Sequence, residues 1–160
     1  MNIKTQTNLY YTVLFSNQEI IFSLIPKTMQ REKDYLKKKI DKLAVVLAEL
    51  LAKVTKTDVA FTKEEFAAEF DKVLNEESNL TIAMILEMKA EVFAQVLRDE
   101  YEFNPNQIHI LADLLYQYSL NFEGYGENLN SKIVALYESC IDNGIALSLD
   151  KYRLIDFLKK

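Results

Sequence analysis

Few side chains in this sequence are of the types that carry catalysis or bind metals. His109 is the only histidine and Cys140 the only cysteine in 160 residues. Clusters of histidine and cysteine around a metal, and triads that need a second histidine, are therefore excluded. His109 is predicted to pack at or near the surface. Cys140 falls on an apolar helical face, where a free thiol behaves as a small hydrophobic group, so we expect neither a metal nor a cofactor.

Acidic residues gather at three places, where paired carboxylates could exchange protons or hold a cation. The three clusters are Glu64, Glu65 and Glu69; Glu76 and Glu77; and Asp99, Glu100 and Glu102. A helix over the first cluster would expose it as a polar face, which makes solvation the better explanation. Gly124 and Gly126 lack the preceding strand and the following basic residue of a phosphate-binding loop. The sequence predicts no catalytic residues.

Charge is distributed unevenly along the chain. Residues 27–56 hold nine basic and four acidic side chains, whereas 57–142 hold five basic and seventeen acidic. The basic part either is a solvated face of a monomer or docks onto an anionic partner or a second copy. Nucleic acid is not expected as that partner, because the sequence pI is about 5.0 and Tyr35 is the only aromatic residue of the basic patch. The lysines of the patch are Lys37, Lys38, Lys39 and Lys42.

A group of tyrosines surrounds the glycine-containing segment 121–128, the best predicted loop of the chain. Tyrosine is enriched in protein contact surfaces, although packing in the core is the competing interpretation. The group consists of Tyr116, Tyr118, Tyr125 and Tyr137. Together with the four lysines, Tyr116 and Tyr125 are the candidate interaction residues.

Composition predicts helices as the elements that position these side chains. The chain is 49% hydrophobic but has only three glycines and two prolines, which favours a few long elements over the many turns of an all-β protein. Its length suits one domain that folds without staples. A lone cysteine fits a reducing compartment, and we expect a cytoplasmic location.

The first 27 residues do not fit the helical pattern. Two apolar runs separated by four polar residues suit a β-hairpin, or the segment is a non-native extension before a start at Met29. No signal-peptide cleavage site follows, and neither run approaches the roughly 20 apolar residues of a membrane span. We therefore read 1–27 as a poorly specified segment and 28–160 as the helical domain.

One long helix is predicted from Thr28 as N-cap to about Val54. Its apolar side chains recur at alternating spacings of four and three, which makes a continuous seam: Leu36, Ile40, Leu43, Leu47, Leu50 and Val54. A seam of three heptads is short for an autonomous coiled coil. We interpret it as the spine of an intramolecular bundle rather than as a dimer interface.

Later helix starts are signalled by caps. Thr62 and Glu65 have the spacing of a capping box, in which hydroxyl and carboxylate satisfy each other's backbone donors. Asn104 is a suitable cap before Pro105, and Gln107 follows three residues after it. The further helices are predicted over 63–75, 80–103, 105–120, 129–142 and 150–160. Because Lys89 interrupts the apolar stripe of 80–103, that region is either one helix or two, 80–87 and 90–102.

The segments Leu111–Tyr116 and Ala135–Cys140 resemble the two helices of a degenerate tetratricopeptide hairpin. The arrangement from Met29, with a basic helix around 34–43 and such a hairpin at the end, is similar to an uncharacterised family of small all-helical bacterial proteins. This resemblance implies no catalytic residues. No second copy at the 34-residue period of a true repeat is present, so the resemblance does not imply repeat-type peptide binding.

The sequence therefore predicts an all-α, single-domain helical bundle with a long N-terminal helix and a TPR-like C-terminal hairpin. Its predicted role is non-catalytic, as a protein that binds a protein partner or itself, with no membrane contact and no evident small-molecule substrate. The alternative is a small ligand-binding or enzymatic bundle that uses core tyrosine and glutamate side chains. A buried carboxylate pair beside a closed cavity would favour that alternative.

Overall fold

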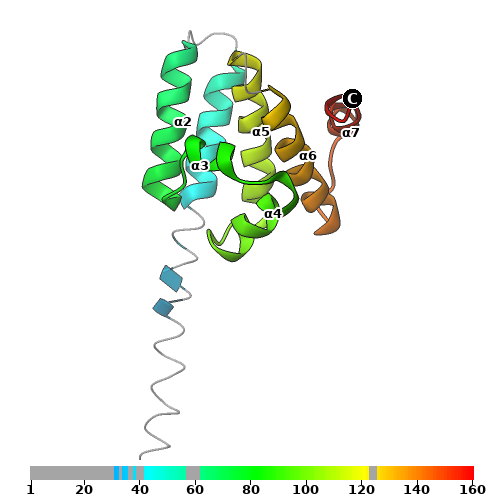
Figure 1. Cartoon of the computed structure of the whole chain (residues 1–160). Helices are drawn as coiled ribbons and strands as arrows, with labels where there is room; N and C mark the ends of the chain where they lie inside the picture. Colours follow the sequence, from blue (N-terminus) through cyan, green and yellow to red (C-terminus); the bar gives the residue numbers. More distant parts are fainter. Residues whose placement is uncertain (1–30, 33, 36–37, 39–41, 57–61, 123–125) are drawn as a thin grey trace, which may run out of the picture. The chain divides into compact units, whose positions relative to one another are not determined.

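The computed structural model describes residues 31–32, 34–35, 38, 42–56, 62–122 and 126–160 (Figure 1). All regular structure in these ranges is helical, which confirms the predicted all-α class for the part of the chain they cover. None of the helices described there is long and apolar enough to cross a membrane. The segment 1–27, its possible β-hairpin and the start at Met29 lie outside these ranges.

The chain divides into two compact units, 1–38 and 39–160. In the first unit the described residues are helical and exposed: Arg31, Glu32, Asp34, Tyr35 and Lys38. The second unit begins its described part with a helix over 42–55, on which Leu43, Leu47 and Leu50 are buried within the same chain. Leu36 and Ile40, the other end of the seam, lie outside the described residues, as does the continuity of the predicted helix 28–54.

Helix α2 (Lys63–Ser78) begins at the predicted capping box. The Thr62 hydroxyl accepts from the Glu65 backbone N–H at 3.2 Å, and the Glu65 carboxylate accepts from the Thr62 N–H at 3.0 Å. The helix runs one turn beyond the predicted end and stops at Asn79, whose φ of 57° is left-handed. One face of the helix is apolar and buried, and it consists of Phe66, Phe70, Val73 and Leu74.

The region 80–103 forms two helices, α3 (Ile82–Glu87) and α4 (Ala90–Asp99), with extended backbone at Met88 and Lys89. In a continuous helix the Leu86 carbonyl would accept from the N–H four residues on. Here it accepts from the Asn128 side-chain amide at 3.1 Å and the Lys132 ammonium at 3.4 Å, both on α6 (Gly126–Asp142). Tertiary hydrogen bonds to α6 therefore stabilise the break. It falls where Lys89 interrupts the apolar stripe.

Helix α5 (Pro105–Asn121) begins at the predicted Asn104–Gln107 capping box, with Pro105 at its first position. It packs along α6, and α6 also contacts α4 and α7 (Leu149–Leu158). Figure 1 shows the helix 42–55 in cyan between α2 and α5, with α7 on the outer side of α6. The α5 side chains that fill the core include Ile108, Leu111, Leu114, Leu115 and Tyr118.

Helix α6 begins earlier than predicted, at Gly126 instead of 129, while the loop residues 123–125 lie outside the described ranges. It ends in a Schellman motif. The Ile145 N–H donates to the Cys140 carbonyl at 2.9 Å, the Gly144 N–H donates to the Ile141 carbonyl at 3.0 Å, and Gly144 has φ 78°. The chain then continues to α7, where the sequence predicts a helix over 150–160.

Candidate functional site

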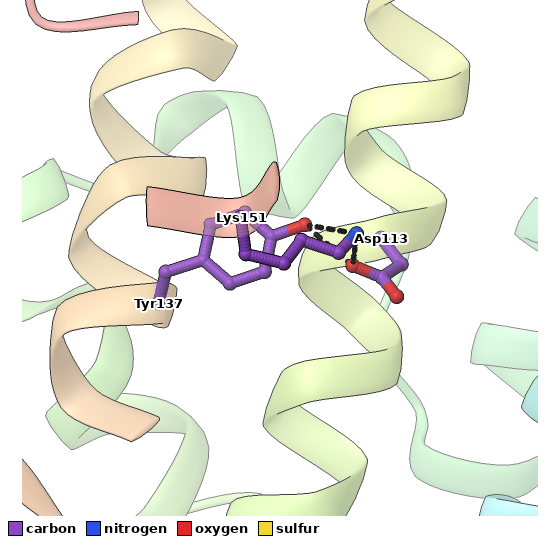
Figure 2. Close-up of polar contacts among 3 residues, drawn as sticks. All are labelled: Asp113, Tyr137 and Lys151. Carbon is purple, nitrogen blue, oxygen red and sulfur yellow. Dashed lines mark hydrogen bonds and ion pairs between the residues drawn. The ribbon is translucent and has the colours of Figure 1, made fainter. Parts of the chain in front are cut away.

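Three polar side chains from three different helices meet at one point of the second unit. Asp113 on α5 accepts with its Oδ1 from the Tyr137 hydroxyl of α6 and from the Lys151 ammonium of α7, each at 2.5 Å. The Lys151 Nζ also lies 3.1 Å from the Tyr137 hydroxyl oxygen. Figure 2 shows that all three heads point toward one another, so the cluster joins α5, α6 and α7.

The cluster forms because each helix presents its polar atom at the edge of an apolar face. Tyr137 is fully buried, whereas the Asp113 and Lys151 side chains are 17% and 26% exposed, so the ion pair borders solvent. The Lys151 ammonium also lies 5.3 Å from the centroid of the Tyr137 ring, a cation–π distance. A second ion pair, Lys159 to Glu138 at 2.6 Å, holds the other end of α7 to α6.

Burial and the nearby Asp113 carboxylate favour the protonated forms of Tyr137 and Cys140. Burial, followed by the hydrogen bond to Asp113, raises the pKa of Tyr137 far above its usual range. Burial, with the Asp113 charge as second cause, raises the pKa of the Cys140 thiol to about 11. The His109 ring stands edge-on to Tyr137 at 6.1 Å, and its buried Nε2 has no hydrogen-bond partner among the described residues. Tyr137 and Cys140 are thus held as neutral acids, not as activated nucleophiles.

The Cys140 thiol predicts a loss of stability in alkali. Its pKa is raised on folding, from 9.0 to about 11, so its protonated form is favoured in the native state. The resulting stabilisation is complete below about pH 9 and decreases as the pH rises toward 11. We expect the free energy of unfolding, measured by urea at successive pH values, to fall more steeply over this range in the wild type than in Cys140→Ala. Parallel profiles for the two proteins would contradict this assignment, because every other titrating group is common to both.

A pocket of about 290 Å³ opens beside the ion pair. One wall comes from the helix 42–55, the other from α5, and Lys151 of α7 closes one side. The lining residues are Ala48, Leu51, Ala52, Thr55, Asp113, Tyr116, Gln117 and Lys151. The pocket thus combines a carboxylate, an ammonium, two uncharged polar groups of α5 and an apolar wall. The pocket is lined by one carboxylate, that of Asp113. A pair of buried carboxylates would have favoured the enzymatic alternative.

Helix α7 carries a second candidate surface on the side that faces away from α6. Its inner stripe, in which Ile155 is buried, consists of Lys151, Leu154, Ile155 and Leu158. Its outer face, exposed throughout, consists of Leu149, Tyr152, Arg153, Asp156 and Phe157. Both sets follow the spacing of one helical face. Phe157 is 68% exposed because α7 docks through the other stripe.

Three of the six candidate interaction residues have described positions in the structure: Lys38, Lys42 and Tyr116. Lys37, Lys39 and Tyr125 lie outside the described residues, and Lys38 is exposed in the first unit. Lys42 is exposed and binds Glu77 of α2 at 2.6 Å; this hydrogen bond and the Glu77 charge raise the pKa of Lys42. One lysine of the basic patch thus meets the acidic part of the same chain.

Tyr116 is half-buried and lines the pocket, so among the candidates with described positions it is the one that reaches this site. Asp113 and Lys151 were not singled out by the sequence. They are 38 positions apart, and no local pattern links them. Of the acidic clusters, Glu65 serves as the capping carboxylate of α2. Over the part of the chain with assigned positions, no three histidine, cysteine or carboxylate side chains are grouped as metal ligands.

Comparison of the chain with protein-family models, with curated proteins and with solved structures found no match.

Proposed function

We propose that this chain is a non-catalytic assembly protein that pairs with a second copy of itself through the outer face of α7. The observation that carries the proposal is the exposure of three large apolar side chains on one side of a ten-residue helix. Leu149, Tyr152 and Phe157 are 65%, 44% and 68% exposed. Phenylalanine and tyrosine are enriched in protein interfaces, and tyrosine is frequent among the few residues that dominate the binding energy.

The charges of this face suit a second copy. Arg153 and Asp156 lie between the apolar residues and are both exposed. In an antiparallel pair of α7 helices, a twofold axis level with the midpoint of these two residues places Arg153 of each copy at the height of Asp156 of the other. Such an arrangement gives two reciprocal ion pairs in an isologous interface. Arg153 already contacts Asp150 in its own helix at 3.6 Å, but a pair this exposed is weak and rearranges at little cost.

A non-catalytic role agrees with the site chemistry. The raised pKa values of Tyr137 and Cys140 keep both side chains protonated, and the Lys151 ammonium forms an ion pair with the Asp113 carboxylate at 2.5 Å. We propose a cytoplasmic location on the basis of the lone, buried thiol. We also keep as a proposal the relation of the α5–α6 hairpin to tetratricopeptide hairpins and to small all-helical bacterial proteins. The close packing of α5 along α6 supports that relation.

The self-pairing predicts a concentration-dependent dimer. Sedimentation velocity at about 100 μM protein, above the micromolar dissociation constants of small interfaces, should show dimers that dissociate on dilution and at high salt. Phe157→Glu places a charge in the apolar part of the face and should give monomers. Leu120→Glu is the matched control, because Leu120 is 58% exposed on α5, outside this face. A wild type that stays monomeric, or a Leu120→Glu variant that loses the dimer equally, would refute the proposed interface.

A further inference from the structure

We infer that the pocket beside Asp113 and Lys151 binds a small zwitterion, a free amino acid with a short apolar side chain. The fold leaves hydrogen-bonding capacity unused at these two residues. Asp113 accepts both of its bonds with Oδ1, and none of the described residues donates to Oδ2, as Figure 2 shows for the cluster. The Lys151 ammonium donates to two oxygens. Because an ammonium has three N–H donors, one of them is left for a ligand.

These unused groups belong to residues that line the pocket. A ligand in the pocket therefore meets one carboxylate oxygen and one ammonium hydrogen close together. Both groups border solvent, so a ligand reaches them without unfolding the cluster. Tyr137 is fully buried, contacts both Asp113 and Lys151 through its hydroxyl, and does not line the pocket.

The charge balance of the pair selects the ligand. A simple anion gains from Lys151 but is repelled by Asp113, and a simple cation meets the reverse. A molecule that carries both charges avoids either repulsion: its ammonium donates to Asp113 Oδ2, and its carboxylate accepts from Lys151. Each contact is then a charge-assisted hydrogen bond.

The rest of the pocket sets the size of the ligand. At about 290 Å³ it lies at the lower end of the range for ligand pockets, which suits a molecule of few heavy atoms. Ala48, Leu51 and Ala52 supply an apolar wall for a short aliphatic side chain. Tyr116 and Gln117 offer further polar contacts on the opposite wall. Valine therefore serves as the probe.

The test is a titration of the ¹⁵N-labelled full chain, followed by amide chemical shifts. Valine should give saturable shifts at Thr55, Asp113, Gln117 and Lys151. It should bind at least about tenfold more tightly than 3-methylbutanoate, which lacks the ammonium, or 2-methylpropylamine, which lacks the carboxylate, because each analogue loses a charged hydrogen bond. The absence of saturable shifts with valine would overturn the inference. So would equal binding of either analogue, which would indicate a site for a single charge.

A pair of variants on the helix 42–55 separates pocket binding from stability. Ala52→Phe fills the pocket while it leaves the Asp113–Lys151 ion pair in place, and it should abolish the shifts produced by valine. Val45→Phe is the matched control, because Val45 is 56% exposed on the same helix and does not line the pocket. Undiminished binding to a folded Ala52→Phe protein would overturn the inference. Because this site does not depend on the proposed pairing of α7, Phe157→Glu should bind valine as the wild type does.

Discussion

Replacement of Asp113 by alanine should lower the free energy of unfolding by about 3 kcal/mol, because it leaves the two donors of the cluster without their acceptor. Tyr137 is fully buried and Lys151 is partly buried, and both donate to the same carboxylate oxygen. The exposed fractions of the ion pair, 17% and 26%, place the cost at the lower end of the range for buried pairs. Urea denaturation at neutral pH measures it.

Two further variants show whether the loss comes from the missing acceptor. Asp113→Asn keeps an oxygen toward Tyr137 and should lose less stability than the alanine variant. The double variant Lys151→Met, Tyr137→Phe lacks both donors. Adding Asp113→Ala to this double variant should lower the free energy of unfolding clearly less than adding it to the wild type. An alanine variant as stable as the wild type would show that the cluster contributes nothing to the packing of α5, α6 and α7.

Replacement of Phe70 by alanine should lower the free energy of unfolding by about 3 to 5 kcal/mol, the largest effect we expect of any single change. The Phe70 side chain is fully buried on α2, and its ring stacks on Phe66 with centroids 5.7 Å apart. It also contacts Tyr118 of α5, with centroids 6.3 Å apart. The substitution therefore opens a cavity where α2 meets α5.

The matched control for the cavity is Phe70→Leu, which keeps most of the buried volume and should cost markedly less than the alanine variant. Urea denaturation monitored by circular dichroism compares the three proteins. A cost below about 1 kcal/mol for Phe70→Ala would mean that the site collapses fully around the smaller side chain, or that α2 is not held against α5 by this contact.

The sequence was most informative where the physical signal is local. The caps at Thr62 and Asn104 depend on side chains three residues away, so their spacing alone identified the starts of α2 and α5. The division of 80–103 was visible only as an interrupted stripe. What settles it is the Leu86 carbonyl, which bonds to side chains more than forty positions away on α6.

The candidate sites could not be predicted from local spacing, because their residues are far apart in the sequence. Asp113 and Tyr137 are 24 positions apart, and Lys151 follows on a third helix, so only the packing of α5, α6 and α7 brings them together. Phe157 shows the opposite case. An apolar side chain of this size is typical of a buried position, yet α7 has two faces with helical spacing, and only the packed structure shows that Ile155 lies on the inner one.

The central claim, an antiparallel pairing of α7 helices across a twofold axis, is tested most directly by a mixing experiment. Arg153→Asp and Asp156→Arg each put like charges opposite one another in the homodimer, so each variant alone should be monomeric. When the two variants are mixed, every facing pair becomes attractive, and native mass spectrometry should detect a heterodimer at the concentrations where the wild type dimerises. Two variants that each dimerise as the wild type does, or a mixture that stays monomeric, would contradict the pairing.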